Sequence, residues 1–189
     1  DYASVIRAVR DAPGGRALRV DPGMSADNRK AFAEGGWLKT GDVGQLDEQG
    51  RLRITGRVKE IFKTEKGKYV APAPIENRLV SFHGIEQACV IGPGLPQPIA
   101  LLNLSPEENA RLEKDGRDEY SRELGELLAR VNQELDAHER LQCLVVVPEI
   151  WAVENGMLTP TLKLKRNELE KLYADRVPGW ARGRGVIWG

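Results

Sequence analysis

Short apolar runs separated by turn-forming residues are the feature that most restricts how this 189-residue chain can fold. The longest run, Cys143 to Val147, has the length of a buried strand and falls far short of the roughly 18 apolar residues that span a membrane. Alternating residues over 43–46 and 52–55 flank Asp47-Glu48-Gln49-Gly50, which predicts a β-hairpin. The pattern therefore favours strands and turns in a folded domain over membrane-spanning helices.

Strand-like and helical segments mix through the rest of the chain. Further strands are predicted at residues 61–64 and 69–70 (a second hairpin), 87–91, 99–104, 143–147 and 150–153. Helices are predicted at residues 2–9, 29–34, 75–81 and 168–173, after the Ser105-Pro106 cap, and after Gly116. The helix after Gly116 has one apolar face, formed by Tyr120, Leu124, Leu127, Leu128, Val131, Leu135 and His138. The expected fold class is α+β, a small mixed β-sheet with packed helices preceded by a β-hairpin.

Charge and cysteine content exclude several classes of function. The chain has 28 Lys and Arg against 28 Asp and Glu, and this zero net charge disfavours nucleic acid as a partner. Its two cysteines, Cys89 and Cys143, suit neither a disulfide framework nor a zinc site. Residues 1–11 lack the apolar core of a signal peptide. We therefore expect a soluble chain in a reducing compartment, the cytoplasm.

The first candidate functional cluster is Gly36-Trp37-Leu38-Lys39-Thr40-Gly41-Asp42. Glycines near Asp42 allow a tight turn that presents its carboxylate to two adjacent hydroxyls, as on a ribose. The alternative is an ordinary turn in which Asp42 caps a backbone amide. Arg57, after the first hairpin, either reaches the same ligand or forms a surface ion pair of about 0.3 kcal/mol.

The second cluster is the cationic segment that follows Leu158-Thr159-Pro160-Thr161. It contains Lys163, Lys165 and Arg166. A lysine carried on a loop suits transient stabilisation of charge on a phosphate or carboxylate. The alternative is a solvated basic strand edge without catalytic role.

Four segments, in this order, resemble motifs of the adenylate-forming superfamily, which includes acyl-CoA synthetases, luciferases and the adenylation domains of peptide synthetases. They are Gly36–Asp42 (GW-x-x-TGD), Ile54–Ile61 (the hinge motif), Glu65–Asn77, and Asn155–Arg166 (the catalytic-lysine segment). The amino-acid sequences of the last two segments are most similar to those of long-chain fatty acyl-CoA synthetases. The lysine segment departs from the more common Lys-Thr-x-x-Gly-Lys, so Lys163 is placed by the Leu-Lys-Arg that follows it, with Lys165 as the alternative.

The resemblance implies an acid–thiol ligase that uses ATP, Mg²⁺ and coenzyme A to convert a fatty acid into acyl-CoA, through an acyl-adenylate. It implies catalytic and nucleotide-binding roles for four residues: Lys163 at the reacting carboxylate and α-phosphate, Asp42 and Arg57 at the ribose, and Ile54 lining the nucleotide site. It further implies a hinge at Lys59 and coenzyme A contacts at Gly67 and Lys68.

The same resemblance divides the chain into residues 1–58, the tail of a large N-terminal domain, and residues 59–189, the mobile C-terminal lid. The expected partners are that N-terminal domain, the fatty acid and coenzyme A, and peripheral membrane association of the full-length enzyme stays open. The fragment alone is expected to be inactive and to bind no cofactor. Alternatives are the lid of an acyl-adenylate ligase acting on a carrier protein, the lid of an aryl-acid CoA ligase, or a non-catalytic interaction module.

Overall fold

The computed structural model describes residues 32–33 and 37–189, which divide between Ile61 and Phe62 into two compact units. In the first unit, β1 (Phe32–Ala33) pairs antiparallel with β2 (Trp37–Leu38). The helix predicted at 29–34 is therefore wrong at its centre, where the chain is extended and paired. The helix predicted at 2–9 lies outside the described residues.

The first predicted hairpin is confirmed as β3 (Asp42–Leu46) paired with β4 (Leu52–Arg57). Its turn is organised by Asp47, whose Oδ1 accepts hydrogen bonds from the backbone N–H groups of Gln49 (3.0 Å) and Arg51 (2.9 Å). These backbone bonds and the Arg51 side chain hold the pKa of the Asp47 carboxyl below its ordinary value. Gly50 supplies the left-handed residue that this turn requires, with φ of 75°.

The second unit begins with a short hairpin and continues as a sheet with helices on both faces. Its strands are β5 (Phe62–Lys63), β6 (Tyr69–Val70), β7 (Ile85–Ile91), β8 (Ile99–Leu104), β9 (Cys143–Val146) and β10 (Gly185–Trp188). Its helices are α3 (Pro72–Val80), α4 (Pro106–Asp115), α5 (Asp118–Gln133), α6 (Arg166–Leu172) and α7 (Val177–Trp180). The α+β class predicted from the sequence is confirmed.

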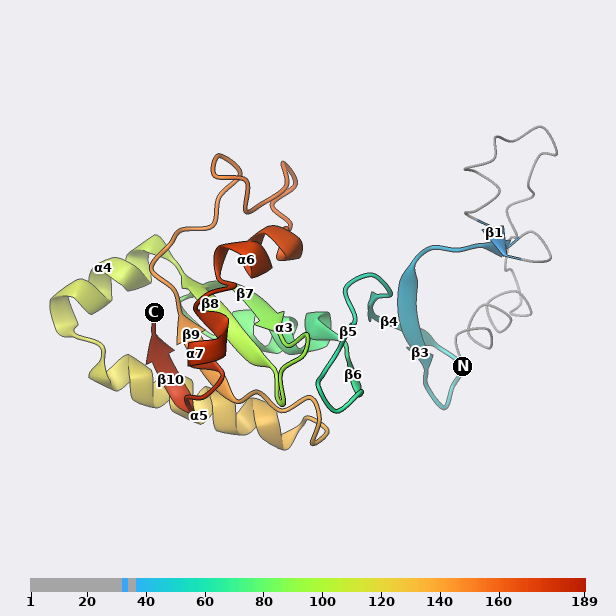
Figure 1. The fold of residues 1–189 in the computed structure, drawn as a ribbon, viewed down its shortest axis with the longest axis horizontal. Coiled ribbons are helices and arrows are strands. Elements are labelled where there is room, and N and C mark those ends of the chain that lie inside the picture. The colour runs from blue at the N-terminus through green and yellow to red at the C-terminus, as the bar shows by residue number, and fades with distance from the viewer. Residues whose placement is uncertain (1–31, 34–36) are drawn as a thin grey trace. The chain divides into compact units, whose positions relative to one another are not determined.

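The main sheet has four strands in the order β10-β9-β8-β7 (Figure 1). β7 and β8 are antiparallel, whereas β8, β9 and β10 run parallel to one another, so the sheet is mixed. Helices α4 and α5 lie in the connection from β8 to β9, and α6 and α7 lie in the connection from β9 to β10. β7 is thus one edge of the sheet and β10 is the other.

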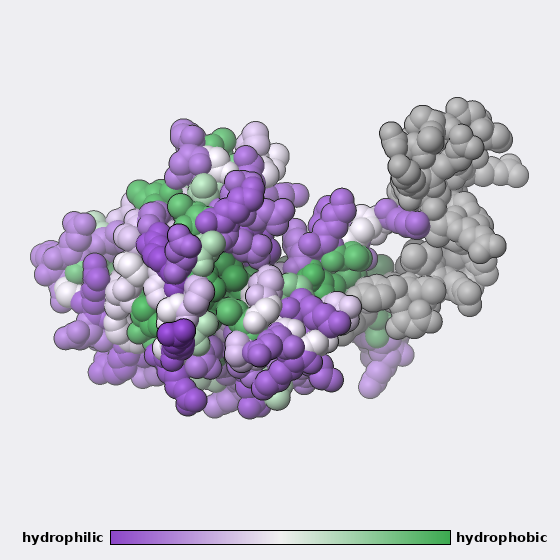
Figure 2. Space-filling view, in the orientation of Figure 1, coloured by the Kyte–Doolittle hydropathy of each residue, from purple (hydrophilic) through white to green (hydrophobic). Residues whose placement is uncertain are grey.

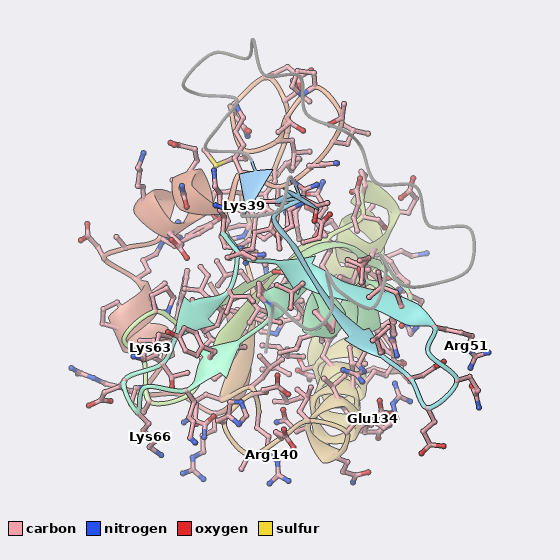
Figure 3. All side chains as sticks on the ribbon, turned by 90° about the vertical axis from the view of Figure 1, so that its right-hand side faces the viewer. Lys39, Arg51, Lys63, Lys66, Glu134 and Arg140 are labelled. Atoms are coloured by element: carbon pink, nitrogen blue, oxygen red, sulfur yellow. The ribbon has the colours of Figure 1, made fainter. Side chains whose placement is uncertain are left out.

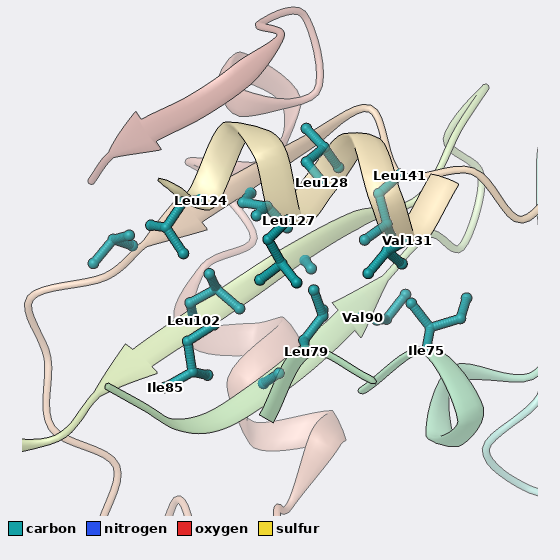
Figure 4. Close-up of a cluster of buried hydrophobic side chains, with 14 of the residues drawn as sticks. Ile75, Leu79, Ile85, Val90, Leu102, Leu124, Leu127, Leu128, Val131 and Leu141 are labelled. Atoms are coloured by element: carbon teal, nitrogen blue, oxygen red, sulfur yellow. The ribbon is translucent and has the colours of Figure 1, made fainter. Parts of the chain in front are cut away.

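Both faces of the sheet are buried, and successive strand residues belong alternately to two separate apolar clusters. On one face, Val90, Leu102 and their neighbours pack against α3 and α5 (Figure 4). On the other face, Ile91, Leu101 and Val145 pack with residues of α6, α7 and the segment before α6. The near-continuous apolar character of β8 and β9 follows from this double burial.

Helix boundaries differ from the prediction where proline and side-chain bonding compete with periodicity. Helix α3 begins at Pro72 instead of residue 75, because Ala71 is extended and Pro72 fits the first helical turn. Ser105 caps α4 as predicted, since its side chain accepts a hydrogen bond from the Glu108 N–H (3.2 Å).

Helix α5 buries most of its predicted apolar face but ends at Gln133, so the prediction that His138 extends that face is wrong. The Asn132 side chain bonds both the N–H (2.8 Å) and the carbonyl (2.9 Å) of Leu141, which turns the chain back toward the sheet. The strand predicted at 150–153 is also absent, because the Asn155 side chain bonds Ile150 O and Ala152 N and forms a local loop.

The C-terminal residues, not predicted as a strand, form β10 beside β9. Trp188 packs against the cluster on the α5 face, and its Nε1 donates to Ser121 Oγ (2.9 Å). The Arg117 guanidinium lies over the Trp188 ring, 4.6 Å from its centroid. On the face drawn in Figure 2, hydrophilic side chains cover much of the surface of the described residues, with apolar atoms visible in smaller groups. In the described part of the chain, no helix is long and apolar enough to cross a membrane.

Candidate functional site

In the first unit, the structure brings Asp42 and Arg57 together. They stand opposite each other in the β3–β4 register, and Arg57 Nε lies 3.3 Å from Asp42 Oδ1. Gly41 precedes Asp42 with φ of 77°, and its carbonyl accepts the Val58 N–H (2.8 Å), which closes this end of the hairpin. A hydrogen-bond-accepting carboxylate and a donating guanidinium are therefore adjacent at this end of the hairpin.

Ile54 and Lys59 lie on the same hairpin and in the turn that follows it. Ile54 is 56% exposed and pairs with Gly44, where an added Cβ would lie 2.8 Å from Leu52 Cδ1. Lys59 is exposed, in a turn closed by the N–H groups of residues 60 and 61 donating to Arg57 O. This turn ends where the first compact unit ends.

In the second unit, Gly67 and Lys68 lie at the tip of the β5–β6 hairpin. Gly67 has φ of 75°, and its N–H donates to Thr64 O (2.9 Å), so the left-handed turn at the tip explains the glycine. Lys68 is exposed, and so are Lys63 and Lys66, which Figure 3 labels on this hairpin. The tip therefore presents several cations at the surface.

The base of the β5–β6 hairpin is fixed to the sheet although its tip is exposed. Phe62 is 8% exposed and packs so closely on Gly92 that an added Cβ would lie 2.3 Å from the ring. At the base, the Gly94 N–H also donates to Lys63 O (3.3 Å), and from the turn the Glu65 N–H donates to Leu95 O (3.0 Å). Gly92 is thus required because a side chain there would collide with the Phe62 ring, whereas Gly67 is required because its backbone is left-handed.

Lys163 lies on a small closed loop, residues 158–165, that precedes α6. Leu158 and Leu164 form an antiparallel bridge at its base, and Leu158 is buried in the second apolar cluster. Lys165 N–H donates to Met157 O (2.9 Å), one residue beyond that bridge. Both lysine side chains are exposed. Lys163 directly follows the turn at residues 160–162, on the returning arm of the loop, and Lys165 is at the start of α6.

Leu162, directly before Lys163, has an unfavourable backbone conformation. Its φ is 58°, and it is the one residue other than glycine with positive φ in the described part of the chain. For an L-residue this left-handed conformation costs roughly 1–2 kcal/mol. The side chain is 69% exposed and gains little from burial, so the surrounding loop must impose the conformation. Such strain concentrates at functional sites.

An ion pair with both side chains only 13% exposed anchors the C-terminal end of this loop. Arg166 Nη2 donates to Glu76 Oε1 (2.7 Å), joining α6 to α3. The Glu76 carboxylate also accepts the Val90 N–H (2.7 Å), and Arg166 Nη1 donates to Val90 O (2.7 Å). Both residues stand in motifs singled out from the sequence, yet no role was predicted for either, because their hydrogen bonds join three separate elements, α3, β7 and α6.

The N-terminal side of the loop is supported by a network of two buried aromatic side chains and a partly exposed ion pair. Trp151 Nε1 donates to the Tyr173 hydroxyl (2.9 Å), which donates to Glu149, and Glu149 also accepts from Arg176. Burial raises the pKa of Tyr173 to about 12. Burial is the largest single influence on Glu149 and opposes its ionisation, but the Arg176 hydrogen bond and charge, a backbone hydrogen bond and the Tyr173 hydroxyl together hold the Glu149 pKa below its ordinary value.

The remaining titratable groups fit structural roles. The Cys143 thiol is buried, and burial raises its pKa to about 11, so it is a packing residue. His83 is exposed, with Nε2 3.0 Å from Glu123 Oε2. Among the described residues, no group of three His, Cys, Asp or Glu side chains is arranged to hold a metal ion.

Comparison with known proteins gives consistent matches. Residues 59–180 match the family model described as the AMP-binding enzyme C-terminal domain. The chain is 33% identical over 161 residues to a long-chain-fatty-acid–CoA ligase, FadD15, of Mycobacterium tuberculosis, covering 78% of this chain and 27% of the relative. It is 36% identical over 160 residues to long-chain-fatty-acid–CoA ligase 5 of Rattus norvegicus, covering 75% of this chain and 23% of the relative.

Among solved structures, the adenylation domain of a carboxylate reductase from Mycobacterium chelonae is similar, with a TM-score of 0.70 and 26% identity. That match covers 83% of this chain and 25% of the other. The chain thus spans about a quarter of the length of the curated relatives it matches.

Proposed function

Because this chain belongs to the family of AMP-binding enzyme C-terminal domains, we propose that it is the catalytic lid of a long-chain fatty acid–CoA ligase. The enzyme would convert ATP, a fatty acid and coenzyme A into acyl-CoA, AMP and pyrophosphate. The identities of 33–36% with long-chain ligases support this acid class over the aryl-acid alternative. They also support coenzyme A, instead of a carrier protein, as the thiol acceptor.

The observation that carries the proposal is Lys163 on a loop fixed at both ends. In the first half-reaction a carboxylate oxygen attacks the α-phosphorus of ATP and pyrophosphate leaves. Two anions must approach each other and charge builds on the phosphoryl oxygens, so a placed ammonium lowers the barrier. Lys163 supplies that ammonium. The backbone of Leu162 supports Lys163 over Lys165, because this left-handed residue occupies the position directly before the lysine, where the common Lys-Thr-x-x-Gly-Lys motif has glycine.

Nucleotide binding is assigned to the first hairpin. Asp42 accepts hydrogen bonds from the ribose hydroxyls, Arg57 donates at the same sugar, and Ile54 offers an apolar contact to the nucleotide. The support for this assignment is the 3.3 Å approach of Arg57 to Asp42 and the exposure of Ile54. Residues 1–58 then belong to the large N-terminal domain and residues 59–189 form the lid.

The second half-reaction is assigned to the β5–β6 hairpin. The coenzyme A thiol attacks the acyl carbonyl and AMP leaves, after the chain has pivoted at Lys59. Gly67 allows the pantetheine to pass close to the backbone, and Lys68 pairs with a phosphate of coenzyme A. A Lys68→Ala change should raise KM for coenzyme A and leave adenylate formation unchanged, whereas an unchanged KM would remove Lys68 from this role.

The decisive experiment compares Lys163→Ala with Lys165→Ala in the full-length enzyme. Lys163→Ala should lower fatty-acid-dependent pyrophosphate release by about 10²–10³-fold, or about 3–4 kcal/mol of transition-state stabilisation. Thioester formation from supplied acyl-adenylate should be largely retained, and Lys165→Ala should change either rate by less than about threefold. Equal loss in both half-reactions for Lys163→Ala would reject the assignment.

Two further measurements test the wider proposal. The 189-residue chain alone should release no pyrophosphate from ATP and a fatty acid, because most nucleotide and acyl contacts belong to the N-terminal domain. A full-length enzyme that prefers aryl acids, or that transfers the acyl group to a carrier protein in preference to coenzyme A, would overturn the long-chain ligase assignment.

A further inference from the structure

Thr159 holds the backbone of Lys163 on both sides. The Thr159 side-chain Oγ1 accepts a hydrogen bond from the Lys163 N–H (3.0 Å), and the Thr159 N–H donates to Lys163 O (2.8 Å). The Leu162 N–H donates to Thr159 O (2.8 Å), which closes the turn between them. One threonine thus fixes the peptide groups that flank the lysine Cα.

These bonds do little for the core of the fold. The loop residues between Thr159 and Lys163 are exposed, and the apolar base of the loop is already secured by the Leu158–Leu164 bridge. Thr161 Oγ1 lies 3.0 Å from Thr159 Oγ1, within hydrogen-bond distance, so the loop side chains also organise one another. A bonded network in an exposed loop, with a left-handed leucine inside it, points to control of the loop's shape and not to fold stability.

We propose that Thr159 is a positioning residue for Lys163, acting through its side-chain bond to the Lys163 N–H. The inference rests on the proposed function of Lys163. With the bond intact, the Cα of Lys163 has one position and its side chain starts from a fixed direction. Without it, the turn samples other conformations, and the ammonium reaches the reacting oxygens in fewer of them. The loss therefore falls on the rate of adenylate formation and not on substrate binding.

The test uses three threonine variants of the full-length enzyme. Thr159→Val keeps the branched shape and removes the acceptor, while Thr159→Ser keeps the hydroxyl. Thr161→Val is the matched control, because the Thr161 hydroxyl contacts Thr159 whereas the Lys163 N–H donates to Thr159. Each variant is measured for fatty-acid-dependent pyrophosphate release, thioester formation from supplied acyl-adenylate, KM for ATP and fatty acid, and thermal midpoint.

Thr159→Val should lower kcat for pyrophosphate release about tenfold, equivalent to about 1.4 kcal/mol, with both KM values and the thioester rate within about twofold of the parent enzyme. Thr159→Ser should restore at least half of the lost rate, and Thr161→Val should lose less than about threefold. A Thr159→Val enzyme within twofold of the parent, or one equally impaired in both half-reactions, would overturn the inference.

Lys163→Ala, measured beside these variants, separates this inference from the proposed function. If Lys163→Ala abolishes adenylate formation and Thr159→Val does not impair it, the positioning role fails and the catalytic role of Lys163 stands. If Lys163→Ala has no effect, the proposed function of the loop fails, and the positioning inference fails with it.

Discussion

Replacing Arg166 by methionine should be among the most destabilising single changes in the second unit. The change keeps a long side chain but removes the guanidinium hydrogen bonds to Glu76 Oε1, Val90 O and Cys89 Sγ. Glu76 then keeps the Val90 N–H but loses its cation, in a position where its side chain is only 13% exposed. The Val90 carbonyl loses its donor at the same time.

The magnitude follows from burial. Breaking a buried ion pair by removing one partner costs roughly 3–5 kcal/mol, because the other charge remains without compensation. The small residual exposure of this pair places the expected loss at the lower end, about 3 kcal/mol. For a chain of this length, that loss corresponds to a fall of about 6–12 °C in the thermal midpoint.

Urea unfolding of the 189-residue chain, followed by tryptophan fluorescence, measures the effect. Lys171→Met is the matched control, since the Lys171–Glu168 pair has the same kind of contact (2.9 Å) with side chains 72% and 46% exposed. The control should change the free energy of unfolding by less than about 0.5 kcal/mol. The double variant Arg166→Met, Glu76→Leu should be more stable than Arg166→Met alone, because no buried charge remains. A loss below about 1 kcal/mol for Arg166→Met would refute the reasoning.

Three other expectations concern the loop supports and the C-terminal strand. Glu149→Gln should lower the free energy of unfolding at neutral pH. The difference between parent and variant should be fully present above the ordinary pKa of 4.5 and should shrink as pH falls through the lowered folded-state pKa. An undiminished difference at about pH 3 in urea titrations would contradict this. Leu162→Gly should raise the free energy of unfolding by about 0.5 kcal/mol, because relief of the left-handed strain exceeds the extra entropy of the unfolded chain, and any measured destabilisation would count against the strain. Trp188→Ala should lower the free energy of unfolding by about 2 kcal/mol and speed amide hydrogen exchange in β10, because the Ser121 hydrogen bond and the Arg117 contact are both lost. Unchanged exchange in β10 would show that Trp188 does not hold the strand.

The sequence predicted best those elements whose signals are local. The Asp47 turn, the strand at 99–104 and the Ser105 cap are set by residues within a few positions of each other, and the structure confirms all three. The sequence also predicted the hairpin that places Asp42 opposite Arg57, although it did not predict the direct contact between their side chains.

Elements decided by distant partners were missed or misplaced. Phe32 and Ala33 follow good helix-capping residues, yet they pair as a strand with residues 37 and 38. The strand at 185–188 contains only three strand-favouring residues, Val186, Ile187 and Trp188, and its order comes from pairing with β9 and from the contacts of Trp188. In the candidate site, the roles of Thr159, Glu76 and Arg166 depend on contacts that spacing alone does not reveal.

The Glu76–Arg166 pair has a consequence for the behaviour of the sheet in solution. Val90 lies on β7, the edge of the main sheet, and its outward N–H and C=O are both taken by these two side chains. An edge strand with open backbone groups is a template for pairing with another molecule and hence for aggregation. Apolar residues of matched size often equal a buried ion pair in stability, but they would leave the Val90 backbone groups open to pairing. At Val90, the charged pair therefore takes the place of a neighbouring strand and blocks backbone pairing at that position of the edge.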